Sequence, residues 1–104
     1  MSEPVDREFK QSPMPQGQDE RIAYRLTTTP WGSNPTTPVV KLFTWPEYED
    51  VTTSKLSGTP SASGDAITTP LVISLTPGQV YRLEIQFVAS GSTWEAFGYI
   101  NAER

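Results

Sequence analysis

Hydrophobic and polar residues alternate most clearly in the C-terminal part of the chain. Residues 80–87 read VYRLEIQF, and their apolar positions recur on every second residue: Tyr81, Leu83, Ile85 and Phe87. A period of two predicts a strand with one buried face. After a short turn, residues 93–101 alternate again, with Phe97 and Tyr99 on one face. The stretch 79–101 therefore predicts a β-hairpin.

The rest of the chain predicts short strands separated by turns rich in proline and glycine. The expected strands are 21–27, 39–45 and 66–75, with one or two weaker strands in 47–58, and the expected loops are 29–38 and 59–65. Pro70 belongs at an edge or a bulge, because proline cannot donate a ladder hydrogen bond. We expect Trp45 and Trp94 in the core. No helical period is visible, and about seven strands at this spacing predict two packed sheets.

A turn motif directly before the clearest strand narrows the fold class. Its residues match the tyrosine corner of Greek-key sandwiches: Leu75, Pro77, Gly78 and Tyr81. Pro77 presets φ for the turn, and Gly78 can adopt a positive φ. The Tyr81 hydroxyl is expected to bond to an upstream backbone group. The sequence therefore predicts an all-β fold, an immunoglobulin-like (fibronectin type III-like) Greek-key β-sandwich, over residues 21–104.

Residues 1–20 do not share this pattern. They are polar and broken by prolines, so they bury little apolar surface and predict an extended or loosely docked N-terminal arm. Val5 and Phe9 are its only large apolar anchors apart from Met14. The arm has no apolar run, so it is not a signal peptide. No stretch of the chain approaches the length that crosses a membrane.

Composition removes several kinds of chemistry. The 104 residues include no cysteine and no histidine, so the sequence offers no disulfide, no thiolate metal site and no Ser–His triad. The net charge is −4, from 12 acidic and 8 basic residues. No basic cluster is present, which argues against a nucleic-acid partner. We expect no enzymatic activity, no cofactor and no metal site.

Two groups of acidic residues are the nearest approach to a chemical site in the sequence. One could offer oxygen ligands to calcium: Glu47, Glu49, Asp50 and Asp65. It lacks the spacing of a calcium-binding loop, so a solvated loop face is the simpler interpretation. Glu84 and Glu95 could form the carboxylate pair of a glycosidase, but we expect them on neighbouring strands, facing solvent and opposite Arg82.

The aromatic residues leave two interpretations open. Trp31 lies in a proline-rich loop, and Phe97 and Tyr99 occupy the second face of the last strand, so these three rings are expected at the surface. An exposed aromatic patch is typical of a binding surface. The patch could stack sugars or contact protein. Protein is favoured, because no set of polar sugar-binding residues accompanies these rings in the sequence.

Several positions along the chain form a set found together in one group of proteins. They are Asp6, Phe9, Lys10 and Pro13, then Tyr24, then Gly78 and Tyr81, and finally the stretch from Trp94 to Ile100. With these residues the chain resembles small bacteriophage virion proteins of immunoglobulin-like type, described as fibre–tail adaptors or as neck and decoration proteins.

This resemblance implies a non-enzymatic structural protein of the virion, such as a tail or neck adaptor or a capsid decoration protein. It would be made in the host cytoplasm and would bind other virion proteins or copies of itself in an oligomeric assembly. The expected interface residues are Val5, Phe9, Trp31, Phe97 and Tyr99. The alternative is a carbohydrate-binding or adhesion module of the same fold. The methionine start and the short polar finish favour a complete small protein over a fragment of an enzyme.

Overall fold

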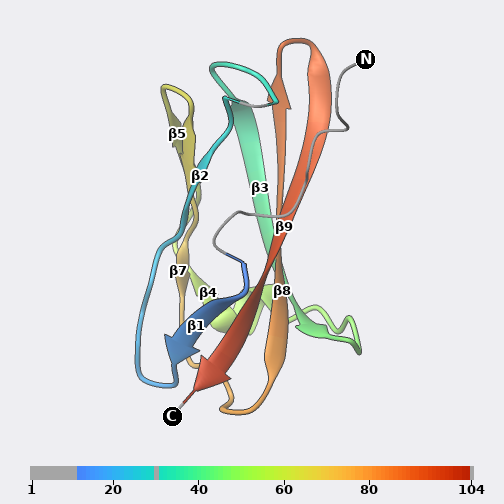
Figure 1. Ribbon diagram of the computed structural model, residues 1–104. Helices are drawn as coiled ribbons and strands as arrows, with labels where there is room; N and C mark the ends of the chain where they lie inside the picture. The colour runs from blue at the N-terminus through green and yellow to red at the C-terminus, as the bar shows by residue number, and fades with distance from the viewer. Residues whose placement is uncertain (1–11, 30, 104) are drawn as a thin grey trace.

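The protein folds almost entirely into β-strands. The computed structural model describes residues 12–29 and 31–103 (Figure 1). In these residues the elements are β1 (Met14–Gly17), β2 (Arg25–Thr27), β3 (Thr36–Trp45), α1 (Thr52–Lys55), β4 (Leu56–Ser57), β5 (Ser61–Ser63), β6 (Ala66–Thr68), β7 (Leu71–Val72), β8 (Val80–Ala89) and β9 (Ser92–Glu103). The predicted all-β character is confirmed. No helix in the described part of the chain is long and apolar enough to cross a membrane.

The strands form three sheets arranged as two layers. One layer is a four-stranded sheet in the order β1-β9-β8-β3, in which β1 runs parallel to β9 and the other pairs are antiparallel. The facing layer contains the sheet β2-β6-β5 and the pair β4-β7. Figure 1 shows β3, β8 and β9 on one side of the molecule and β2, β5 and β7 on the other. The arrangement resembles a β-sandwich.

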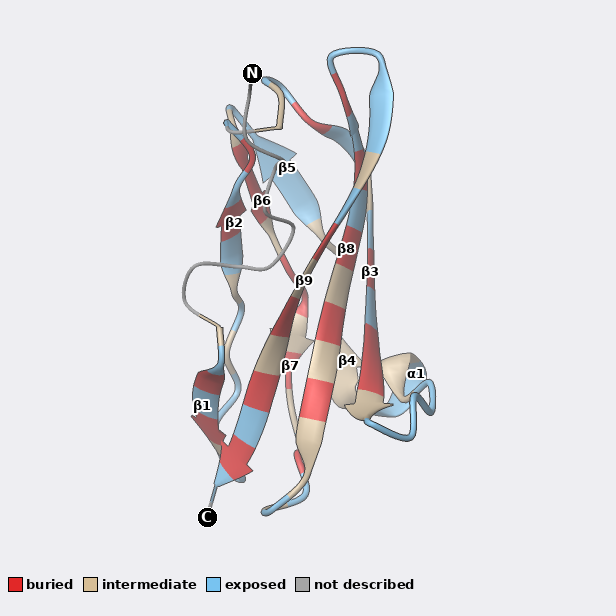
Figure 2. Ribbon diagram, turned by 45° about the vertical axis from the view of Figure 1, so that its right-hand side comes forward, coloured by how far each residue is buried: buried red, intermediate tan, exposed pale blue. Residues whose placement is uncertain are grey.

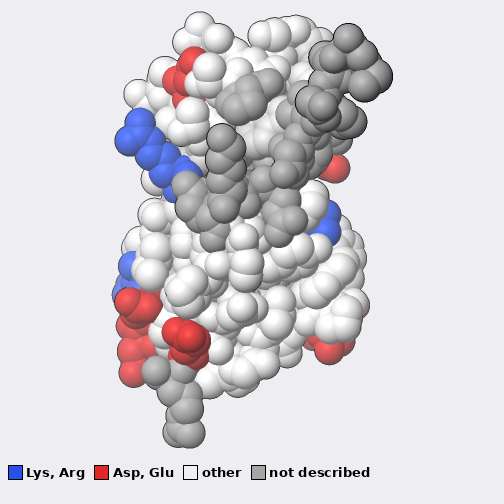
Figure 3. All heavy atoms as spheres, in the orientation of Figure 1, with Lys and Arg blue, Asp and Glu red and all other residues white. Residues whose placement is uncertain are grey.

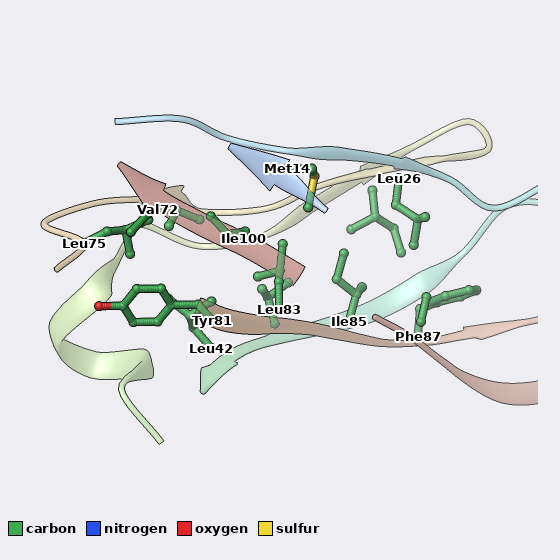
Figure 4. Packing of buried hydrophobic residues seen from close by; sticks show 14 of the residues in the cluster. Met14, Leu26, Leu42, Val72, Leu75, Tyr81, Leu83, Ile85, Phe87 and Ile100 are labelled. Atoms are coloured by element: carbon green, nitrogen blue, oxygen red, sulfur yellow. The ribbon is translucent and has the colours of Figure 1, made fainter. Parts of the chain in front are cut away.

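The core lies between these two layers (Figure 4). Its largest fully buried apolar side chains come from both: Leu42, Ile67, Val72, Leu75, Tyr81, Leu83, Ile85, Phe87 and Ile100. Burial alternates along β8 and β9, as the red bands in Figure 2 show. Each such side chain contributes roughly 1.5–3 kcal/mol when it leaves water, so the alternation fixes which face of β8 points inward.

The predicted hairpin is confirmed. β8 and β9 pair in one continuous register from Val80↔Asn101 to Ala89↔Ser92. The two residues of the turn, Ser90 and Gly91, both have positive φ, at 52° and 80°. Positive φ at both turn positions matches the right-handed twist of the flanking strands.

The turn before β8 has the local geometry that its residues predict. Gly78 has φ +86°, and its N–H donates to the carbonyl of Ala102 at 3.0 Å. Tyr81 is 1% exposed and lies at the same end of the core as Leu75 (Figure 4). Its hydroxyl accepts a hydrogen bond from the N–H of Thr76 at 2.9 Å. The bond closes the turn and gives the buried hydroxyl a partner.

Two segments differ from their predicted conformations. Residues 47–58, expected to form one or two strands, contain the single-turn helix α1 before the short strand β4. The carboxylate of Asp50 accepts from the N–H of Thr52 at 2.9 Å, and such a local bond needs no apolar period. Residues 59–65, expected to be a loop, contain β5, whose exposed side chains leave no alternation to detect.

The segment 66–75 is divided at its proline, as predicted. β6 ends at Thr68 and β7 begins at Leu71, on either side of Pro70. β6 pairs with β2 and β5, whereas β7 pairs with β4. The missing N–H of Pro70 therefore falls where the chain passes from one sheet to the other.

Part of the predicted N-terminal arm belongs to the folded domain. Met14–Gly17 pairs with Ile100–Glu103 of β9, which corrects the boundary expected after residue 20. Met14 and Gln16 are buried. The Gln16 side chain donates to the carbonyl of Val72 at 2.8 Å and accepts from the Tyr24 hydroxyl at 2.7 Å. These partners lie outside β1, so the four-residue sequence of β1 gives no sign of them.

Candidate functional site

The outer side of the four-stranded sheet carries the large exposed apolar side chains of the part of the chain that the structure describes. Among the described residues, the large hydrophobic side chains that are exposed are Val39 at 45%, Tyr48 at 48% and Val88 at 37%. Val39 on β3 precedes the buried Val40, and Val88 on β8 lies between the buried Phe87 and Ala89. Tyr48 follows β3 and stacks on its Phe43. All three therefore lie on one side of the molecule, away from the core.

Five rings from β3, β9 and the loop after β3 form a connected cluster on this side, which we call the aromatic face. Phe43 and Tyr48 stack with centroids 4.2 Å apart and planes inclined by 6°. Trp45 contacts Tyr48 at 6.1 Å and Tyr99 at 5.4 Å. Tyr99 contacts Phe97 at 5.8 Å. Tilted and stacked contacts of this kind stabilise each pair beyond simple burial.

Arg82 lies at the centre of the aromatic face. Its guanidinium carbon is 4.1 Å from the ring centroid of Phe97 and 5.2 Å from that of Trp45. Its Nη1 donates to the hydroxyl of Tyr99 at 3.0 Å, and its Nε donates to Glu84 at 2.8 Å. A planar guanidinium can stack on a ring and bond at its edge simultaneously, which a lysine cannot do. The contacts hold Arg82 in one orientation.

Glu84 connects Tyr48 to Arg82 through its carboxylate. The same carboxylate oxygen that pairs with Arg82 also accepts from the Tyr48 hydroxyl at 2.7 Å. This hydrogen bond to a carboxylate raises the pKa of Tyr48, because the bond requires the protonated hydroxyl. Beside it, Gln86 donates to Glu95 at 3.3 Å.

A shallow pocket of about 150 Å³ opens between these groups. It is lined by Arg82, Glu84, Glu95, Ala96 and Phe97. The structure thus brings both carboxylates of the predicted pair to one pocket. Glu84, however, is already engaged by Arg82, so its charge is partly compensated there.

The sequence-predicted interface residues do not all meet. Phe97 and Tyr99 belong to the aromatic face, on the outer side of β9 as expected. Trp31 lies elsewhere: it packs against the buried Phe87 at 5.9 Å, and its indole N–H is buried without a hydrogen-bond partner among the described residues. Val5 and Phe9 lie outside the described residues.

The prediction for Trp45 is wrong. The sequence places this ring in the core with Trp94, but it lies on the outer face of β3 and contacts Arg82. Trp94 packs partly buried against the core. The sequence of β3 could have shown this, because Phe43 and Trp45 are two residues apart and therefore lie on the face opposite the buried Leu42. The alternation of β8 places Arg82 on this outer face too, whereas nothing in the sequence indicates that Tyr48, in the loop after β3, joins these residues.

The acidic loops form local hydrogen bonds. Asp65 accepts from the Asn34 N–H at 3.1 Å and from the Thr29 hydroxyl at 3.2 Å, which ties two loops together. Hydrogen bonds from Thr52 lower the pKa of Asp50. Within the described residues, no group of three or more potential ligands could hold a metal ion. On the face shown in Figure 3, the described Lys and Arg side chains are scattered rather than gathered into one patch.

Comparisons with known proteins identify no relative: no family model, curated protein or solved structure matches this chain.

Proposed function

We propose that this chain is a non-enzymatic assembly protein that binds other copies of itself through the aromatic face. The observation that carries the proposal is the gathering of Val39, Tyr48 and Val88 on one side of one sheet. Interfaces are enriched in aromatic residues and arginine, and they bind best where these groups are already held in place. The fixed position of Arg82 supplies that condition.

The finer fold and the biological setting belong to the same proposal. The hydrogen bond at Tyr81 supports an immunoglobulin-like Greek-key sandwich, since such a closed turn is typical of that fold. The setting, a bacteriophage virion in which the chain acts as an adaptor or decoration protein, rests on the resemblance of the sequence. Many copies act together in a virion, so a weak contact per copy is sufficient.

The proposal is tested by the mass of the protein in solution, measured by light scattering over a range of concentrations. Val39→Lys changes an exposed side chain of β3 on the outer side of the same sheet, and Tyr48→Ala changes an exposed ring of the aromatic face, so both variants should fold normally. Ala62→Lys is the matched control, because Ala62 is exposed on β5 in the other layer. Circular dichroism checks that all variants retain their strands.

We expect the wild type and Ala62→Lys to form the same oligomer, and Val39→Lys and Tyr48→Ala to shift toward the monomer. A buried lysine without a partner is costly, which gives the direction of the shift. A wild type that stays monomeric up to about 1 mM would contradict self-assembly, because the contact would then provide less than about 4 kcal/mol. An equal loss of mass in the control would also contradict it.

Carbohydrate binding is the second candidate, favoured by one feature of the aromatic face. The polar groups missing from the sequence-based interpretation are present, since Glu84, Gln86 and Glu95 lie beside the rings. Sugar sites combine a ring for stacking with a few oriented polar groups. A screen of sugars by tryptophan fluorescence tests this function, with Trp45→Phe identifying the reporting ring. Quenching that Tyr48→Ala abolishes would support it, and no response to any sugar would refute it.

A further inference from the structure

Two exposed charges of opposite sign lie on the outer side of the four-stranded sheet. Lys41 belongs to β3 and Glu95 to β9. Within the described residues neither side chain forms an ion pair, since the ion pair of this face joins two other groups. Glu95 accepts one hydrogen bond, from the uncharged Gln86 at 3.3 Å. Both charges are therefore available to a charged group of another molecule.

The register of the sheet places these two charges on opposite sides of β8. β3 and β9 are the two neighbours of β8, so the cation lies on one flank of the face and the acid on the other. Lys41 lies opposite Glu84 of β8, and Glu95 lies opposite Gln86, two residues further along β8. Two residues of a strand span about 7 Å. The flanking charges thus differ by a single step along the strands.

The central strand between the flanks carries no net charge on this face. Its Arg82 and Glu84 form an ion pair at 2.8 Å, and the Tyr48 hydroxyl donates to the same carboxylate at 2.7 Å. The next residues outward on β8 are Gln86 and the exposed Val88, which are uncharged. The unpaired charges of the face are therefore confined to its two flanks.

A face with opposite charges on its two flanks is complementary to a second copy of itself. In a two-fold dimer both copies use the same surface, so a residue i of one copy contacts residue j of the other, and j contacts i. A two-fold axis that runs along β8 lays β3 of one copy over β9 of the other. Lys41 of each copy then approaches Glu95 of the other, and its flexible four-carbon stem can cover the step between them. Val88, beside the axis, meets Val88 of the second copy.

We propose that the outer side of the four-stranded sheet forms a face-to-face, two-fold dimer in which Lys41 of each copy pairs with Glu95 of the other. The proposal rests on the proposed function, since it specifies the symmetry and the charged contacts of the same self-assembly. Complementary charges fix the relative orientation of two surfaces and disfavour other arrangements. Because one surface is used by both copies, the assembly closes at two chains.

Charge reversal on separate chains tests the two contacts with the full-length protein. Lys41→Glu brings two acids together at each contact, and Glu95→Lys brings two lysines together. Like charges across an interface are unfavourable, so light scattering should show that each variant alone dissociates at least about tenfold more readily than the wild type. In a 1:1 mixture one variant supplies acids at both positions and the other supplies lysines, so both contacts of a mixed dimer are complementary.

Mixing should therefore restore the wild-type mass. Lys41→Glu also places an acid opposite Glu84 of its own chain, but an effect within one chain would not be rescued by mixing. Arg25→Glu and Asp19→Lys are the matched controls, because they make the same charge changes at exposed residues of β2 and of the turn after β1. Neither control should change the mass, alone or mixed. Circular dichroism checks that every variant retains its strands.

The salt dependence of the dimer gives a second readout. The wild-type dimer should weaken as sodium chloride is added, because salt screens exposed charges. The double variant Lys41→Met, Glu95→Gln lacks both charges, so its dissociation constant should change less with salt than that of the wild type. An equal salt dependence in the two proteins would contradict the charged contacts.

Two results would overturn this dimer: a mixture that fails to regain the wild-type mass, or a wild-type mass that grows beyond two chains at high concentration. If Val39→Lys and Tyr48→Ala still dissociate the wild-type oligomer in that case, the self-assembly stands and only this arrangement fails. If the wild type stays monomeric up to about 1 mM, the arrangement and the proposed self-assembly both fail.

Discussion

Replacing Arg82 by methionine tests whether the aromatic face is a fixed unit. The change keeps an unbranched side chain over the rings but removes the guanidinium, which lies 4.1 Å from the Phe97 centroid. A cation over a ring is worth about 1 kcal/mol when partly exposed. The ion pair with Glu84, whose side chains are each 22% exposed, adds roughly 0.5 kcal/mol after solvent screening. The hydrogen bond to Tyr99 adds about 0.5–1 kcal/mol.

Together these contacts predict that Arg82→Met lowers the free energy of unfolding by about 2 kcal/mol. This is slightly less than the sum of the three contributions, because contributions of groups in contact do not simply add. Urea denaturation measures the loss. For a domain of this size, about 2 kcal/mol corresponds to a fall in melting temperature of roughly 8–16 °C. Arg82→Lys should recover only part of it, because an ammonium group lacks the planar shape that stacks on Phe97.

A double-mutant cycle with Phe97→Leu isolates the stacking contact. We expect a coupling free energy of about 1 kcal/mol between the two positions, nearly unchanged by salt at the stacked ring. The ion-pair part should weaken in high salt, because exposed charges are screened. Ala62→Lys, in the other layer, should show no coupling to Arg82. A coupling below about 0.3 kcal/mol would refute the reasoning, since that is the ordinary scatter of independent sites.

Three further changes test the rest of the fold. Tyr81→Phe should cost about 1 kcal/mol in thermal or urea unfolding, because the N–H of Thr76 loses its acceptor; no loss would mean that the bond does not stabilise the turn. Burial, and then the charge of Glu20, raises the pKa of Tyr24 to about 12, so the stability it contributes should be complete below pH 10 and lost as the pH rises toward 12. In an absorbance titration, Tyr24→Phe should remove a tyrosine that ionises near pH 12, and the absence of such a tyrosine in the wild type would contradict this. Gln16→Leu should lower the free energy of unfolding by about 1–3 kcal/mol, because the Tyr24 hydroxyl loses its acceptor and the Val72 carbonyl loses its donor. An unchanged midpoint of urea unfolding would contradict this.

Much of the strand framework could be predicted from local patterns. The β8–β9 hairpin follows from strict alternation and from the turn residue Gly91, which takes a positive φ without steric cost. The break at Pro70 follows from its missing N–H. These features depend on residues close in the sequence, so the sequence alone contains the relevant chemistry. Helix α1 and strand β5 could not be predicted in this way, because neither has an apolar period.

The aromatic face is only half visible in the sequence. Phe97 and Tyr99 can be assigned to the outer side of the last strand, because successive side chains of a strand point to opposite faces. The sequence predicts Trp45 in the core and Trp31 at the surface. In the structure both rings are half-buried, with Trp45 on the outer face of β3 and Trp31 packed against the core. A large aromatic ring suits either location, so its type does not decide between them.

The sequence by itself determined that this protein is built from β-strands, which faces of its longest strands are buried, and where its chain turns. These properties depend on a period of two and on the backbone freedom of single residues. Only the tertiary structure decided that Arg82 meets rings from separate segments and that Met14–Gly17 joins the sheet. Each of these depends on which strands become neighbours, and pairing between distant segments follows from burial of the whole core rather than from any local pattern.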